Sequence, residues 1–223
     1  MDMPGDDAGS DVLIEYGVYT LAALGADRSA TEIATPFEAK QSVLRAAQRG
    51  RRASGEAVIA AGALAEAAEI EVEAVVRRVE TRALESVNKK RSQEPYATLF
   101  PGNLTGALAP VGRAQATVAT RIADFLAPRE GARLSGVSDE VASFAPELRE
   151  KLTAFGARLD GVDAAEAAAV AAFAAELTAR RQWREHYRKT HALLTALYPT
   201  DRRKVESFFK AAKKAKKNAP PTT

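Results

Sequence analysis

Apolar residues recur at three- and four-residue intervals along most of this chain, which is the period of an amphipathic helix. Over residues 11–25 this spacing predicts a short helix ending at Gly25, with a strand as the alternative because Val12 to Val18 contains β-branched residues. Further on, small and branched apolar residues form a seam typical of close helix–helix contact. The seam comprises Val58, Ala61, Ala65, Ala68, Val72, Val75 and Val79.

Local signals set the expected ends of a first long helix. Thr35-Pro36-Phe37-Glu38 combines an N-cap residue, a proline suited to the first helical position and a glutamate three residues after the cap. No further proline occurs before Pro95, so we predict a helix over about 36–91. Three glycines interrupt it and are its weakest positions: Gly50, Gly55 and Gly62.

The second half of the chain carries similar signals. A helix is expected from Pro110 to about Leu126, and Ser138 is expected to cap another that Pro146 kinks or divides. The Asp160-Gly161 pair is expected to end that segment. A capping box starting at Asp163 then predicts a second long helix over about 164–197, and Asp201 is expected to cap a short basic helix.

These elements predict an all-α fold, an elongated helical bundle of five or six helices with two long ones. We expect a disordered acidic tail at 1–10, a first helical half at 11–103, a second at 104–199, a basic helix at 200–217 and a disordered tail at 218–223. Short matches at shifts of 97 and 98 residues raise the alternative of a tandem pair of related units. The matching segments are 66–69 with 163–166, and 99–101 with 197–199.

Composition narrows the class of protein. Alanine makes up about a fifth of the chain, aromatic residues only 6%, and cysteine is absent, which excludes disulfides, thiolate metal sites and a cysteine nucleophile. The longest apolar run, 167–175, is far shorter than the roughly 20 residues of a membrane-spanning helix. The acidic first residues do not resemble a secretory signal, and we therefore expect a cytoplasmic protein.

Candidate chemistry is sparse. His186 and His191 are five residues apart and point about 140° away from each other on a helix, so they do not chelate one metal together. Neither a Walker loop, a dinucleotide fingerprint nor a nucleophile elbow occurs. Glu66, Glu69 and Glu73 share a helix face, but intrahelical ion pairs with nearby arginines are the simpler interpretation. We predict a protein that is not an enzyme, without catalytic residues, cofactor or metal.

Charge distribution is the most distinctive property. Residues 1–35 hold seven acidic residues against Arg28 alone, whereas residues 180–217 hold thirteen lysines and arginines against three acidic residues. Trp183 and Tyr187 lie among these basic residues, as core residues or as stacking platforms. The candidate contact residues for a partner or nucleic acid are Arg180, Arg181, Arg184, Arg188, Lys189, Arg202, Arg203, Lys204, Lys210, Lys213, Lys214, Lys216 and Lys217.

Three hypotheses follow. The first is a structural or assembly protein that self-associates through helical faces and oppositely charged ends, with itself or another protein as partner. The second is a sequence-neutral nucleic-acid-binding protein that uses residues 180–217. The third is a peripheral membrane protein whose Phe208, Phe209 and lysines meet an anionic surface.

Overall fold

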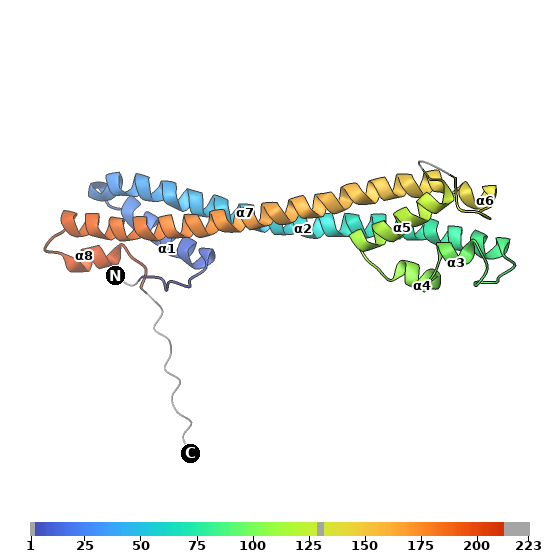
Figure 1. Ribbon diagram of the computed structural model, residues 1–223. Helices are drawn as coiled ribbons and strands as arrows, with labels where there is room; N and C mark the ends of the chain where they lie inside the picture. The colour runs from blue at the N-terminus through green and yellow to red at the C-terminus, as the bar shows by residue number, and fades with distance from the viewer. Residues whose placement is uncertain (1–2, 129–131, 212–223) are drawn as a thin grey trace, which may run out of the picture. The chain divides into compact units, whose positions relative to one another are not determined.

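The fold is all-α with two long helices, as the apolar periodicity predicts. A computed structural model describes residues 3–128 and 132–211 (Figure 1), and no strand occurs among them. The helices are α1 (Ser10–Gly25), the 3₁₀ turn η1 (Arg28–Ala30), α2 (Thr31–Ser86), α3 (Tyr96–Leu99), α4 (Asn103–Leu108), α5 (Arg113–Leu126), α6 (Asp139–Ala142), α7 (Ala145–Leu197) and α8 (Arg202–Ser207).

The chain forms two compact units whose boundaries differ from the sequential halves, 11–103 and 104–199, expected above. Unit 1 combines Met1–Ser54 with Ala169–Thr223, and unit 2 is the intervening segment Gly55–Ala168. Both long helices, α2 and α7, contribute residues to both units, so the boundary between the units falls within these helices.

The core of unit 1 is an aromatic cluster enclosed by α1, α2, α7 and α8 (Figure 1). Trp183 and Tyr187 are both fully buried and their rings stack at 4.8 Å between centroids. Phe37 of α2 packs against Trp183 at 5.7 Å, and Phe209 meets the edge of Tyr187 at 5.1 Å. Rings at these separations gain attraction beyond the burial of their area, so this cluster is the main hydrophobic anchor of the unit.

One glutamine ties three helices of unit 1 together. The side chain of Gln41 is buried, accepts a hydrogen bond from Trp183 Nε1 at 2.6 Å and donates one to the carbonyl oxygen of Ile14 at 2.9 Å. It occupies the space beside Gly17, where an added Cβ would lie only 2.0 Å from Gln41 Oε1. The close approach of α1 and α2 therefore depends on the absence of a side chain at Gly17.

The core of unit 2 follows the predicted seam of α2. Val72, Val75 and Val79 are at most 1% exposed and pack within a cluster that includes residues from α3, α5 and α7. Tyr96, Leu99 and Phe100 are buried in the same cluster.

The start of the first long helix was predicted five residues too late. Asp27 accepts a hydrogen bond from Ser29 N at 2.9 Å, and η1 leads directly into α2 at Thr31. Pro36 therefore lies inside the helix rather than at its first position. Its missing N–H removes a single backbone hydrogen bond close to the helix start, where the loss is smallest. The helix continues through Gly50, Gly55 and Gly62.

The second long helix is longer than the predicted 164–197. It runs over Ala145–Leu197, so Pro146 stands in its first turn, a favourable place for proline, and kinks nothing. Asp160-Gly161 does not end the helix either. A glycine inside a helix costs only about 1 kcal/mol relative to alanine, which is too little to end this long helix.

Two predicted tails have different outcomes. Residues 3–9 of the expected N-terminal tail contact α7, and Pro4 among them is buried. The predicted basic helix 200–217 is confirmed only as α8, whose cap Asp201 accepts from Lys204 N at 2.9 Å. Residues 212–217, and the tail 218–223, lie outside the part that the structure describes.

Candidate functional site

The predicted contact residues of α7 divide into two groups with opposite roles. Arg180 and Arg184 point toward the N-terminal segment and make hydrogen bonds within unit 1. Arg181, Arg188 and Lys189 are exposed, and within the described residues they form no ion pair. Only this second group presents charge to an external partner.

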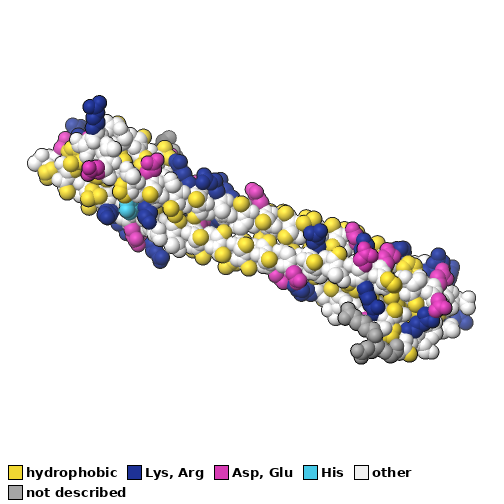
Figure 2. All heavy atoms as spheres, turned by 90° about the horizontal axis from the view of Figure 1, so that it is seen from above, with side chains coloured by type: hydrophobic (Ala, Val, Ile, Leu, Met, Phe, Trp, Pro, Cys, Tyr) yellow, Lys and Arg dark blue, Asp and Glu magenta, His cyan; other side chains and the backbone are white. Residues whose placement is uncertain are grey.

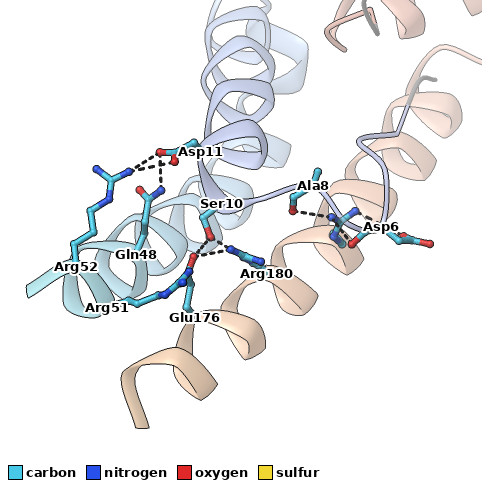
Figure 3. Close-up of polar contacts among 10 residues, drawn as sticks. Asp6, Ala8, Ser10, Asp11, Gln48, Arg51, Arg52, Glu176 and Arg180 are labelled. Carbon is cyan, nitrogen blue, oxygen red and sulfur yellow. Dashed lines mark hydrogen bonds and ion pairs between the residues drawn. The ribbon is translucent and has the colours of Figure 1, made fainter. Parts of the chain in front are cut away.

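A buried carboxylate organises the first group. Glu176 is 1% exposed and accepts hydrogen bonds from Ser10 Oγ, from Arg51 at 3.0 Å and from Arg180 at 3.0 Å (Figure 3). Burial alone would raise the pKa of Glu176, but these three donors outweigh it and the net shift is downward. Glu176 therefore stays ionised and joins the first residue of α1 to both long helices.

Arg184 clamps the residues before α1. Its guanidinium donates to the carbonyl oxygens of Pro4, Gly5 and Ala8 at 3.0, 2.7 and 3.2 Å, and its side chain is 11% exposed. Carbonyl groups of an irregular segment need such donors, because no helix or sheet supplies them. Arg184 is thus a structural residue and not a free contact for nucleic acid.

The acidic and basic ends of the chain pair with each other inside unit 1. Lys204 of α8 lies 2.9 Å from Asp27, and Lys210 forms an ion pair with Glu15 of α1. Asp11, also in α1, is paired with Arg52 at 2.9 Å (Figure 3). Much of the charge contrast that the sequence displays is consequently used within the fold.

The remaining residues predicted to contact a partner or nucleic acid are either exposed or outside the residues that the structure describes. Arg203 is exposed, and Arg202 is exposed and paired with Glu206 one helical turn away at 2.9 Å. Lys213, Lys214, Lys216 and Lys217 lie outside the described residues.

The Asp27 contact gives unit 1 a defined acid sensitivity. Hydrogen bonds from Lys204, from Tyr198 Oη at 2.7 Å and from Ser29 N lower the pKa of Asp27 to about 2. A carboxyl group with an ordinary unfolded pKa near 4 then stabilises the fold above about pH 4, and this contribution disappears as the pH falls toward 2.

We expect Asp27→Asn to lower the free energy of unfolding relative to the unchanged chain at neutral pH, with the difference shrinking between about pH 4 and pH 2. Denaturant titrations of both proteins across this range measure it. Asp7→Asn, at an exposed carboxylate, is the matched control. A difference that stays constant down to pH 2 would show that the ionised carboxylate is not the stabilising form.

Trp183, Tyr187, Phe208 and Phe209 are core residues. All four are at most 5% exposed, so none is available as a stacking platform for a base. Because Phe208 and Phe209 are buried, they are not exposed to contact a membrane surface, as the third hypothesis requires.

The structure also places the residues considered for metal binding. Glu69 accepts from Gly112 N at 2.7 Å, and Glu73 accepts from Gln115 and Arg77, both at 3.2 Å. Within the described ranges no three His, Cys, Asp or Glu side chains converge as a metal-binding group. Burial lowers the pKa of both His186 and His191, and nearby lysines lower that of His186 further.

The sequence interpretation overlooked a charge division within α2. Residues 40–52 contain five basic and no acidic residues, whereas residues 53–76 contain five glutamates and no basic residue. The change of sign coincides with the boundary between the two units at Ser54 and Gly55. This signal is readable from the sequence, but it is hidden when charge is counted over the chain ends alone.

Comparison with known protein families, with curated proteins and with solved structures finds no match for this chain. Across residues 3–128 and 132–211, no helix combines the length and apolar character needed to cross a membrane. The fold and its surfaces define a class, an all-α protein of two units that share two long helices.

Proposed function

We propose that this protein is a non-catalytic structural or assembly protein that self-associates through the faces of its long helices. The observation that carries the proposal is the exposure of large apolar side chains along α2 and α7. Ile59 is 74% exposed, Val170 71% and Ile70 61%. Figure 2 shows many hydrophobic side chains at the surface. The others of this kind on the two helices are Val43, Leu64, Phe173, Leu177, Leu193 and Leu197.

The α7 segment 167–175 strengthens the proposal. It consists entirely of apolar residues, so it has no polar face to direct toward water. Helices that are apolar all round are normally buried from several sides. Here Val170 and Phe173 remain exposed within unit 1, and contiguous exposed apolar surface of this kind marks protein interaction sites. Burial against other helices is the simplest way to remove this surface from water.

Size-exclusion chromatography with light scattering tests the proposal. We expect a mass of at least twice the 23.8 kDa of one chain at micromolar concentration and low salt. The run is repeated at about 1 M salt, where charge interactions beyond about 3 Å are screened while apolar contacts persist. A single-chain mass at both salt concentrations and at high protein concentration would refute self-association.

A second candidate function is sequence-neutral nucleic-acid binding. It is supported by the exposure of Arg181, Arg188, Lys189 and Arg203, which makes their charges available to a phosphate backbone. The same chromatography distinguishes it, because co-purifying nucleic acid raises the ratio of absorbance at 260 nm to that at 280 nm and is removed by salt.

A further inference from the structure

Unit 1 carries an apolar groove between its two long helices. The groove is an open depression of about 570 Å³, and its walls include Val43 and Ala46 from α2 and Ala174, Ala175 and Thr178 from α7. Among the described residues no charged side chain lines it. Its floor of alanines allows the close approach of another helix, because small side chains let two backbones come together.

Exposed arginines border this groove. Arg49 follows Ala46 by three residues and Arg181 follows Thr178 by three, so each lies beside a groove residue on the surface of its helix. Both side chains are exposed, and neither forms an ion pair within the part of the chain that the structure describes. Lys40 also borders the groove and donates to the wall residue Gln182 at 3.3 Å, whereas exposed Glu185, three residues after Gln182, adds one negative charge on the α7 side. The groove is therefore apolar inside, and its border carries a net positive charge.

Unit 2 carries a helix face of complementary character. Ile59, Ala63, Ala67 and Ile70 of α2 recur at spacings of four, four and three residues, so they share one face of the helix, and all of them are exposed. We call these four residues the isoleucine stripe. Its two large side chains lie at the ends and its alanines between them, and none of the described helices of unit 2 buries it.

Unpaired glutamates flank the stripe. Glu56 precedes Ile59 by three residues and Glu66 follows Ala63 by three. Both are exposed, and no ion pair is formed by either among residues 3–128 and 132–211. By contrast, Glu71 on the same helix is already paired with Lys151 at 2.8 Å.

We infer that the groove of unit 1 receives the isoleucine stripe of unit 2 from a second copy of this chain, which deepens and rests on the self-association proposed above. The apolar parts of the two surfaces have matching chemistry. The unpaired arginines at the groove meet unpaired glutamates beside the stripe, which favours this pairing and disfavours groove–groove and stripe–stripe contacts. Each copy of the chain carries one groove and one isoleucine stripe, so a second copy supplies one acidic, apolar helix face for every groove.

Contact between two different surfaces has a structural consequence. Such a heterologous contact joins copies into a closed assembly or extends as a chain, according to the rotation between them. The charges that direct it lie on the long helices rather than at the chain ends, where Lys204 and Lys210 pair with Asp27 and Glu15 within unit 1.

Reversing the charges of each surface tests the inference. One variant carries Arg49→Glu with Arg181→Glu, and the other carries Glu56→Lys with Glu66→Lys. Each alone places like charges at the contact, so we expect its self-association to weaken at least about tenfold. An equimolar mixture restores opposite charges between the altered groove of one variant and the altered stripe of the other. Light scattering of the mixture should then show association recovering in the low-salt buffer.

The control for the groove variant is Arg28→Glu with Arg203→Glu, which changes the net charge by the same amount at exposed positions outside the groove. We expect it to associate like the unchanged chain. Association of both surface variants at unchanged strength, or a mixture that fails to recover, would overturn the inference while leaving self-association intact. A monomeric unchanged chain would instead refute both proposals.

The absence of cysteine permits a second, geometric test. Thr178→Cys places a thiol in the groove and Ala63→Cys places one in the stripe, both at exposed positions of an otherwise thiol-free chain. Mild oxidation of the mixed variants should give a disulfide-linked pair of chains faster than oxidation of either variant alone. Equal or faster cross-linking of Thr178→Cys with itself would overturn the inference in favour of a groove–groove contact.

Discussion

Replacing Trp183 by alanine is expected to lower the free energy of unfolding by about 3–5 kcal/mol. The indole is fully buried between Phe37 and Tyr187, so its removal leaves a large cavity in the main anchor of unit 1. Gln41 Oε1 also loses the hydrogen bond from the indole N–H, and an unsatisfied buried acceptor adds to the loss. Urea denaturation followed by helical circular dichroism measures the change.

Leu197→Ala is the matched control for this prediction. It also removes a large apolar side chain from α7, but Leu197 is 39% exposed and belongs to neither core cluster. A change within about 0.5 kcal/mol is expected there. A Trp183→Ala loss no larger than that of the control would show that the aromatic cluster does not hold the unit together.

Gly17→Ala is the second change with a large expected effect. Alanine is normally the better helix former by about 1 kcal/mol, yet here its methyl group would overlap the amide of Gln41. The amide would have to move and release its bonds to Trp183 and Ile14, so we expect a net destabilisation of about 1–3 kcal/mol. Thermal and urea denaturation both report it.

Gly50→Ala isolates the contribution of helix propensity, because nothing lies within 4 Å of a Cβ added at that helical position. There the gain in helix propensity acts alone, and we expect stabilisation of up to about 1 kcal/mol. The two substitutions are chemically identical and have opposite expected signs. Stabilisation by Gly17→Ala as well would mean that α1 and α2 approach less closely than the structure shows.

The predictable part of the fold is local. The spacing of Val72, Val75 and Val79 predicts a buried helical seam, and Ser138 and Asp201 are recognisable caps. Two predicted helix ends were wrong. Pro36 lies inside α2 close to its start, where its missing N–H costs least, and the low helix propensity of Gly161 is too small a penalty to end α7.

The candidate surfaces could be predicted only in part. Arg181 is exposed as a contact residue should be, whereas Arg184 and Arg180 have the same local context and turn inward. What distinguishes them is contact with the N-terminal segment, which lies 170 or more positions earlier in the chain and packs against α7. Two of the three partners of the buried carboxylate Glu176 likewise come from segments that are distant in sequence and meet it only in the folded chain.

The division of unit 1 between two distant stretches of chain sets the order of folding during synthesis. Unit 2 is one continuous segment and has all its residues once Ala168 has been made, whereas unit 1 still lacks Trp183, Tyr187 and Phe209. At about 5–20 residues per second, the interval between Ala168 and Phe209 lasts roughly 2–8 s. During it, Leu13, Phe37 and Leu44 have no core to enter, and the nascent chain is then most exposed to aggregation and to chaperones.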